Sequence, residues 1–358
     1  MSWTDILGHD TAKRLLSAHL ASGTTAGAYL FAGPDGVGKR RLALELAKAL
    51  NCVGEAGRGL PQAAVLPSPP RAPRGAPDVV TGRVEGCDQC LTCRQIDRGV
   101  HPDVHVLQGG GASQQIGVEE VRHLLGRIEL RPFSARVQVA ILDGAERMTE
   151  EAANAMLKTL EEPSSRTKFL LITAELLRCL PTVVSRCQLI RCQPLPAETV
   201  QQILVGAHDC VPAVATVASK LSQGSASRAI ALARRWEVYA KGAERFCDES
   251  VESWMAHPLP ETRQEVMAWL ELMMAWLRDL AVCAVTVSRS EADESPSGWI
   301  AHTPFEESLR RQAVAIDVDR CVETVFDLMA LRDSLEQFVS PRLVASLARE
   351  KWLALTTV

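Results

Sequence analysis

The sequence predicts an α/β domain followed by helical domains, on three observations. An apolar run at residues 28–32 passes through a glycine-rich turn into residues 41–50, where leucines recur at helical spacing. Further apolar runs at residues 137–143 and 168–174 predict buried strands, and the stretch between them is rich in helix-forming Ala, Leu and Glu. Beyond residue 196 the apolar spacing is mainly helical. Alternating strands and helices are typical of α/β domains.

The turn after the first predicted strand has the sequence GPDGVGKR. Gly33, Gly36 and Gly38 allow the backbone to curl so that its N–H groups converge, and Lys39 can reach phosphate oxygens. This spacing, between a strand and a helix, matches a phosphate-binding P-loop better than a chance glycine turn. A P-loop places Ser or Thr next, to ligate Mg²⁺, but this chain has Arg40, which cannot ligate a metal. The predicted fold is therefore intact, while its catalytic equipment is damaged.

The composition sets limits on the kind of protein. A chain of 358 residues, 47% of them apolar, is long enough for two or three folded domains. The net charge of −4 gives no electrostatic reason to wrap nucleic acid. Eleven cysteines without a signal peptide predict a reducing, cytoplasmic environment with free or metal-bound thiols. The apolar run 266–287 contains three charged residues, so it predicts a buried helix and no membrane span.

A segment of different composition follows the P-loop helix. Residues 53–86 are rich in Pro, Gly and Arg with little periodicity, which predicts a flexible surface insertion. The arginines in it are candidates for nucleic-acid contact, but solvated loop charge is the favoured explanation.

Three cysteines after this insertion have metal-ligand spacing. Cys87, Cys90 and Cys93 form C-x-x-C-x-x-C, and Cys52 makes a fourth ligand if the insertion loops out. Four thiolates are typical of structural zinc and leave no open position for catalysis. An iron–sulfur cluster is an alternative, without the expected electron-transfer context. A redox dithiol is another, against which the third cysteine argues.

The strand predicted at residues 137–143 ends in Asp143. In P-loop proteins an acidic residue at this position helps to hold Mg²⁺. A hydrolysing enzyme of this kind would place Glu next, to polarise the attacking water, but Gly144 follows. Glu146 lies two residues further on and would need a local shift to replace it. We therefore expect a second catalytic element to be missing.

Two polar side chains near the last predicted strands are candidates for nucleotide contact. Thr173, near the end of the strand at 168–174, is placed to sense a phosphate or merely to satisfy the backbone. Arg186 follows a short turn before the final strand. A lone exposed Arg is usually solvated, but beside a P-loop domain it becomes a candidate arginine finger for a neighbouring subunit's nucleotide.

The motifs GPDGVGKR, CDQCLTC followed by HPD, LDGAERMTEEAANAMLKTLEEPS and SRC occur in this order. The series resembles the AAA+ clamp-loader subunits of bacterial DNA polymerase III, and among them it is most similar to the delta-prime type. The resemblance covers about residues 1–235, and more faintly the SPR at 340–342. Several motifs in one order are more specific than any single motif.

The resemblance implies particular roles for these residues. In this family the ATP-hydrolysing gamma/tau subunits carry an intact P-loop Thr and an Asp-Glu pair, whereas delta-prime carries degraded versions and keeps the SRC arginine. Arg40 and Gly144 agree with delta-prime. The resemblance implies that Arg186 completes the adjacent gamma/tau site in trans. It also implies structural Zn²⁺ held by Cys52, Cys87, Cys90 and Cys93. Residues that would contact ATP, should it bind, are Gly33, Gly36, Gly38, Lys39, Asp143, Thr173 and Arg228.

We expect three parts: an AAA+-like P-loop domain with a zinc module at residues 1–195, a small helical lid at 196–235, and an all-α collar for oligomerisation at 236–358. The expected function is that of a ring member without ATPase activity of its own. It would act with gamma/tau and delta subunits to place the sliding clamp on primed DNA. Three alternatives remain: an active AAA+ ATPase motor in which Glu146 or another carboxylate substitutes, a P-loop phosphotransferase, and a zinc-based DNA-binding module.

Overall fold

The structure is a computed structural model that describes residues 3–54, 85–110, 115–129, 131–164, 166–248, 250–288, 298–336 and 339–356. The predicted insertion at 53–86 lies outside these residues, except for 53–54 and 85–86. The chain forms two compact units. The first comprises Met1–Thr199 with Gly224–Ser227, and the second comprises Val200–Gln223 with Arg228–Val358. The finer division into lid and collar stays a prediction.

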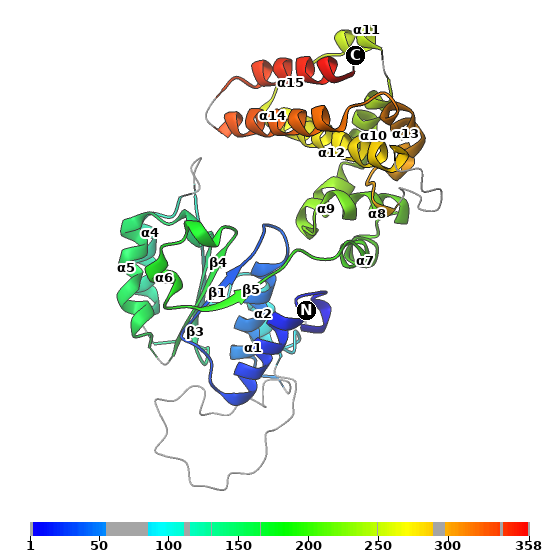
Figure 1. The fold of residues 1–358 in the computed structure, drawn as a ribbon. Helices are drawn as coiled ribbons and strands as arrows, with labels where there is room; N and C mark the ends of the chain where they lie inside the picture. The colour runs from blue at the N-terminus through cyan, green and yellow to red at the C-terminus, as the bar shows by residue number, and fades with distance from the viewer. Residues whose placement is uncertain are drawn as a thin grey trace. The chain divides into compact units, whose positions relative to one another are not determined.

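The first unit is built on a five-stranded parallel sheet of order β2-β3-β4-β1-β5 (Figure 1). Its strands are β1 (Ala28–Ala32), β2 (Val104–Gln108), β3 (Gln138–Asp143), β4 (Thr167–Thr173) and β5 (Gln188–Arg191). Its helices are α1 (Asp10–Ser22), α2 (Lys39–Asn51), α3 (Leu91–Asp97), α4 (Val118–Ile128), α5 (Glu150–Glu161) and α6 (Pro181–Val184). Short 3-10 helices lie at Trp3–Asp5, Ala145–Arg147 and Leu176–Arg178. The predicted α/β fold is confirmed.

Both faces of this sheet are buried, which explains the uninterrupted apolar runs in the sequence. Along β1, Tyr29 and Phe31 pack with α1 and α2, whereas Ala28 and Leu30 pack with α4 and α5. Figure 1 shows these helix pairs on opposite sides of the sheet. The register pairs Ala32 with Thr173. The carboxyl ends of β1, β3 and β4 therefore share one edge, which is where parallel α/β sheets place their ligand sites.

The second unit is helical throughout its described residues. Its helices are α7 (Ala197–His208), which begins in the first unit, α8 (Pro212–Leu221), α9 (Ala226–Arg234), α10 (Trp236–Glu244), α11 (Val251–Ala256), α12 (Arg263–Ser288), α13 (Glu306–Ala313), α14 (Val318–Glu336) and α15 (Pro341–Thr356), with 3-10 turns at Arg245–Cys247 and Thr303–Phe305. Its core is aromatic: the ring of Phe246 lies 4.8 Å from Trp352 and 5.6 Å from Trp276, between ring centroids.

The predicted buried helix at 266–287 is α12. One of its charged residues, Asp279, is buried and has hydrogen-bond donors around it. Asp279 is fully buried and accepts the backbone N–H groups of Ala301 and His302, each at 2.8 Å. A buried carboxylate with such donors costs far less than an unpaired one. None of the helices in the described part of the chain combines the length and apolarity that crossing a membrane requires.

Candidate functional site

The predicted P-loop joins β1 to α2 at the carboxyl edge of the sheet. A Cβ atom at Gly33 would overlap the carbonyl oxygen of Cys192, so no side chain fits there. Gly36 and Gly38 have φ angles of +76° and +109°, which only glycine adopts without strain. The loop tip also packs on the segment Gly224–Ser227, because the N–H of Ser227 donates to the carbonyl oxygen of Gly36 at 3.2 Å. The backbone itself thus requires the three glycines.

Lys39 is turned into this loop. Its side chain is only 5% exposed, and its Nζ donates to the carbonyl oxygens of Gly33 at 2.5 Å and Pro34 at 2.7 Å. Asp35 lies 3.5 Å from the same ammonium. The positive charge is therefore held where the loop curls, as a phosphate-binding site requires, although a phosphate would have to compete with these carbonyl groups.

Arg40 lies beside the carboxylate that the sequence analysis assigned to Mg²⁺. The Nη1 atom of Arg40 lies 3.5 Å from Oδ2 of Asp143, and the Nε2 of Gln108 donates to that same oxygen at 2.8 Å. Asp143 ends β3 and Gln108 ends β2, in register with each other. The positive charge next to this carboxylate is thus an arginine side chain of the same chain. Gln108 was not predicted, because no motif singles it out.

The carboxylate proposed to replace the missing Glu is buried elsewhere. Glu146 is 5% exposed, and one of its oxygens has no hydrogen-bond partner among the residues that the structure describes. Burial first, and also the nearby carboxylate of Glu146, raises the pKa of the Cys179 thiol. Cys179 belongs to the core on the α4 and α5 face of the sheet, whereas α2 covers the other face. Glu146 therefore borders the face opposite to the P-loop helix.

Thr173 and Arg228 have partners within the chain. The hydroxyl oxygen of the fully buried Thr173 accepts the N–H of Glu175 at 3.2 Å and the thiol of Cys179 at 3.3 Å. These contacts match the second of its two predicted roles, satisfaction of local groups. Arg228 lies in α9, within the second unit, with its Nη2 3.6 Å from Oε1 of Glu271. A role of either residue in nucleotide sensing stays a prediction.

Arg186 occupies an exposed turn between α6 and β5. The guanidinium donates from Nε and from Nη2 to Oε1 of Glu161, the former at 2.7 Å. From Nη1 it donates to the carbonyl oxygen of Thr182 at 2.9 Å and to Ser185 Oγ at 3.3 Å. The side chain is 32% exposed, so it lies at the surface in a defined orientation.

The four cysteines predicted as metal ligands come together. Cys52 follows α2, Cys87 and Cys90 precede α3, and Cys93 lies in its first turn. All four sulfur atoms lie within 4.8 Å of one another. In a tetrahedral zinc site with Zn–S bonds of about 2.3 Å, sulfur atoms are about 3.8 Å apart, so the residues fit a Zn²⁺ ion with modest contraction.

Backbone groups around this cluster favour thiolates. The N–H groups of Cys87, Cys90 and Cys93 donate to the sulfurs of Cys52, Cys87 and Cys90 at 3.3–3.4 Å. Burial opposes ionisation of Cys90, but backbone N–H groups of Cys93 and Val53, together with the thiols of Cys93 and Cys87, lower its pKa to about 6. Burial raises the pKa of the Cys52 and Cys93 thiols, so Cys90 is the thiol that ionises most readily. A deprotonated sulfur is the form that binds a metal. The cluster is therefore suited chemically, as well as sterically, to a divalent cation.

A buried lysine fastens the thiol cluster to the P-loop helix. Lys48 of α2 is fully buried, and its Nζ lies 2.6 Å from Glu45, 2.5 Å from Asp88 and 3.1 Å from Asp97. Burial alone would lower the pKa of Lys48. The three carboxylates outweigh burial and raise this pKa above its usual value, so the ammonium stays charged. Burial also raises the pKa of Glu45 to about 7. The sequence did not reveal this cluster, because Glu45 and Lys48 match an ordinary surface pair at i, i+3.

Replacing Lys48 by methionine is expected to lower the free energy of unfolding by about 3–5 kcal/mol, because three carboxylates lose their buried counter-charge. Denaturant unfolding of the full chain, followed by circular dichroism, measures the loss. Lys158→Met is the matched control, since Lys158 is an exposed lysine of α5. Equal stability of the two variants would show that the buried cluster contributes nothing.

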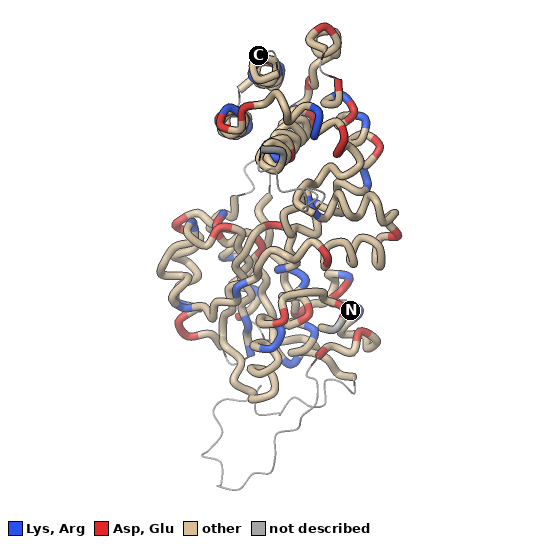
Figure 2. The backbone as a smooth tube through the Cα atoms, turned by 45° about the vertical axis from the view of Figure 1, so that its right-hand side comes forward, with Lys and Arg blue, Asp and Glu red and all other residues tan. Residues whose placement is uncertain are grey.

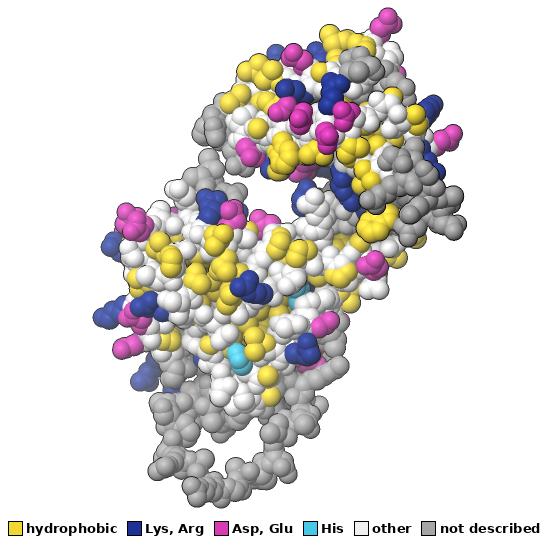
Figure 3. Space-filling view, in the orientation of Figure 1, with side chains coloured by type: hydrophobic (Ala, Val, Ile, Leu, Met, Phe, Trp, Pro, Cys, Tyr) yellow, Lys and Arg dark blue, Asp and Glu magenta, His cyan; other side chains and the backbone are white. Residues whose placement is uncertain are grey.

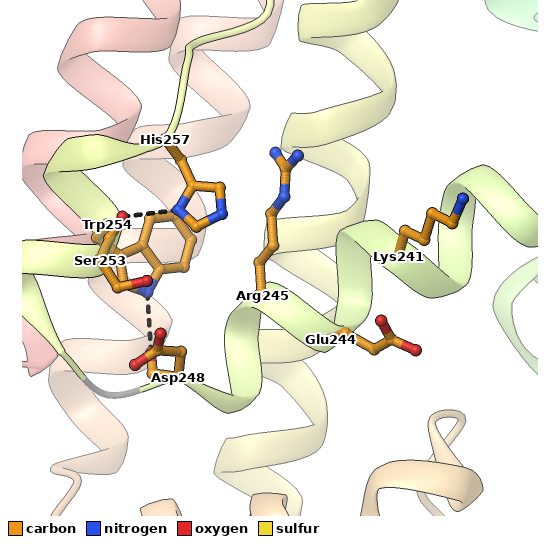
Figure 4. Close-up of a pocket in the computed structure, with 7 residues that line it drawn as sticks. All are labelled: Lys241, Glu244, Arg245, Asp248, Ser253, Trp254 and His257. Carbon is orange, nitrogen blue, oxygen red and sulfur yellow. Dashed lines mark hydrogen bonds between the residues drawn. The ribbon is translucent and has the colours of Figure 1, made fainter.

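The second unit contains a hollow of about 340 Å³ (Figure 4). Lys241, Glu244, Arg245, Asp248, Ser253, Trp254 and His257 line it. The indole N–H of Trp254 donates to the carbonyl oxygen of Asp248 at 3.0 Å, and Figure 4 shows the cationic and acidic side chains spread around the rim. Its charged side chains are exposed and of both signs, so the hollow does not select a ligand by charge.

Comparison with known proteins agrees with this geometry. Residues 8–62 and 79–196 match the family described as DNA polymerase III, delta subunit. DNA polymerase III subunit delta' of Bacillus subtilis is 31% identical over 210 residues, which cover 59% of this chain and 54% of the relative. Subunit delta' of Pseudomonas aeruginosa is 35% identical over 194 residues, which cover 54% of this chain and 48% of the relative. The aligned stretch thus spans about half the length of these relatives.

Among solved structures, a DNA polymerase III gamma subunit-related protein from Thermotoga maritima is 16% identical and has a TM-score of 0.40, covering 91% of this chain and 98% of that chain. The parallel sheet and the glycine-rich loop at its carboxyl edge together define an α/β protein of the P-loop class. Within that class, residues 8–62 and 79–196 are similar in sequence to the delta' subunits of DNA polymerase III.

Proposed function

We propose that this chain is a ring subunit of the DNA polymerase III clamp loader that does not hydrolyse ATP itself and lends Arg186 to a neighbouring gamma/tau site. The observation that carries the proposal is the Arg40 guanidinium 3.5 Å from Asp143. In P-loop NTPases the metal at this place bridges the β- and γ-phosphates and neutralises developing charge. A guanidinium at this place repels Mg²⁺ and supplies no ligand. Hydrolysis also requires a Glu that polarises the attacking water, and this chain has Gly144 at the position where that Glu is expected.

The rival function, an active ATPase motor, requires another carboxylate to polarise water. Glu146 is the nearest candidate in sequence, and its burial beside Cys179 disfavours it. Binding of ATP without hydrolysis is compatible with the retained glycines and with Lys39. Zn²⁺ held by Cys52, Cys87, Cys90 and Cys93 would be structural, because four thiolates leave no position for a reacting water.

The proposed partners are gamma/tau and delta subunits, with the sliding clamp and primed DNA reached through the complex. Lysines and arginines are mixed with acidic residues along the described chain (Figure 2), which supports shared rather than independent DNA binding. The second unit carries an apolar groove of about 650 Å³ between α12 and α14, where Trp299 and Phe326 are about two-thirds exposed. Apolar side chains also reach its surface in Figure 3. A collar that packs on neighbouring subunits would cover such a surface.

Hydrolysis by the isolated chain tests the proposal. The purified full chain with Mg²⁺ and ATP is expected to show no turnover above background. The same chain, added to gamma/tau and delta subunits of its own organism with clamp and primed DNA, is expected to raise ATP hydrolysis by the complex. Turnover by the isolated chain that Asp143→Asn abolishes would instead establish the motor function.

A further inference from the structure

The side chain of Arg186 is held mainly by one acidic residue. Glu161 is the last residue of α5, 25 positions before Arg186, and its Oε1 atom accepts two of the guanidinium's N–H groups. It is the sole charged partner of Arg186 among the residues that the structure describes. The two remaining acceptors, the carbonyl of Thr182 and the hydroxyl of Ser185, are neutral and belong to the same turn as the arginine.

Counting donors shows how little of the guanidinium is available. It carries five N–H groups. Two donate to Glu161, and the two on Nη1 donate to Thr182 and Ser185, which leaves a single N–H on Nη2. Arginine normally binds a phosphate through two parallel N–H groups. An incoming γ-phosphate therefore has to displace some of the present partners.

The two sets of partners differ in strength. The guanidinium is an ionised donor to both sets, but only Glu161 adds a full opposite charge and takes two N–H groups at once, which makes its contact the stronger one. A phosphate should therefore displace the neutral acceptors at Nη1 and leave the ion pair with Glu161 in place. The Nε and Nη2 edge would stay on α5 while the Nη1 and Nη2 edge faces the phosphate. A long side chain that carries about 2 kcal/mol of rotamer entropy would then already be ordered before the neighbour's nucleotide arrives.

We propose that Glu161 is a positioning residue for Arg186: it holds the guanidinium by one edge so that the opposite edge can bind the γ-phosphate of a neighbouring subunit. This inference rests on the proposed function of Arg186 in trans. Glu161 itself touches no substrate, and it acts only through the arginine. Because an arginine finger stabilises the transition state, loss of its positioning should lower kcat and leave the KM for ATP unchanged.

The test compares Glu161→Gln with Glu162→Gln in the reconstituted complex, with Arg186→Ala as reference. Glu162 is the adjacent exposed carboxylate and so controls for loss of one surface charge. We expect Glu161→Gln to lower kcat about fivefold at unchanged KM, as suits a partly exposed ion pair, with Glu162→Gln like wild type and Arg186→Ala far lower than either. A second readout is independent of activity: the Nε–H resonance of Arg186 in ¹⁵N NMR of the full chain, assigned by its absence in Arg186→Lys, should shift in Glu161→Gln only.

The outcomes separate the two ideas. If Arg186→Ala abolishes stimulation but Glu161→Gln matches wild type, the positioning role is overturned and the proposed function stands. A rise in rate for Glu161→Gln overturns it too, because Glu161 would then restrain the arginine. If Arg186→Ala leaves the complex unchanged, the proposed function is overturned, and the inference with it. An unshifted Nε–H resonance in Glu161→Gln shows that the ion pair does not hold in solution, which also overturns the inference.

Discussion

On the proposed function, replacing Arg186 by alanine is expected to lower ATP hydrolysis at the neighbouring gamma/tau site by about 10³-fold or more. The reason is electrostatic: a guanidinium placed against the γ-phosphate neutralises charge that develops in the transition state, in a site from which water is largely excluded. Arg186→Lys is expected to recover only part of the rate, since an ammonium keeps the charge but lacks the planar fork. Single-turnover hydrolysis by the complex with clamp and primed DNA measures the affected site.

The matched control for this variant is Arg178→Ala. Arg178 lies in a nearby turn, is 65% exposed and pairs with Glu175 at 3.3 Å, so its loss removes a similar surface charge. Both variants should enter the complex and keep the circular dichroism of the wild-type chain. A complex that hydrolyses ATP equally fast with Arg186→Ala and Arg178→Ala would rule out the arginine finger.

Loss of metal from the thiol cluster is expected to have the largest effect on stability. The purified chain should contain about one zinc ion, and Cys93→Ser should lose it, because three thiolates bind far more weakly than four. Structural zinc sites carry apparent binding free energies of about 10–16 kcal/mol in small modules, so even a fraction of this should lower the unfolding temperature by about 10 °C or more. Metal analysis and thermal unfolding of the full chain measure both quantities.

Cys210→Ser is the control for the metal experiment, since Cys210 lies in the second unit outside the cluster. It should keep both the zinc and the wild-type unfolding temperature. If the purified chain instead contains iron and absorbs visible light, the four thiols hold an iron–sulfur cluster and not zinc. A metal-free chain of equal stability would show that the thiols are not a metal site.

Local patterns in the sequence were sufficient for the strands and helices. The apolar run Ala28–Ala32 has the same bounds as strand β1, because a strand buried on both faces leaves an uninterrupted apolar signal in the sequence. The helix predicted from residue 41 begins two residues earlier, at Lys39, since Gly38 serves as its N-cap and the basic residues continue the helix. The cysteine spacing predicted that three thiols would lie together, and Cys52 joins them because α2 ends beside them.

Contacts between distant residues could not be obtained in this way. Arg40 and Asp143 are 103 positions apart. In the sequence alone, Arg40 is a departure from the P-loop motif and Asp143 is a match to the expected acidic residue, with nothing to connect the two. Only the adjacency of β3 to β4, and of β4 to β1, brings them together. Likewise, nothing in the sequence says that Lys48 is buried or that Glu161 faces Arg186. Such pairs depend on the order of the strands and on which face of the sheet each helix covers.

The helix α2 has one further consequence. It begins at Lys39 in the phosphate-binding loop and ends at Asn51, directly before the first cysteine of the metal cluster. Its thirteen residues make a rod of about 20 Å. The thiol cluster at the end of α2, and the carboxylates around Lys48, hold the carboxyl-terminal half of this helix, so we expect them to restrict its rotation and sliding at the loop end as well. We therefore expect an oxidant or chelator that opens the thiol cluster to loosen the phosphate-binding loop Gly33–Lys39, although it would act at the other end of the helix.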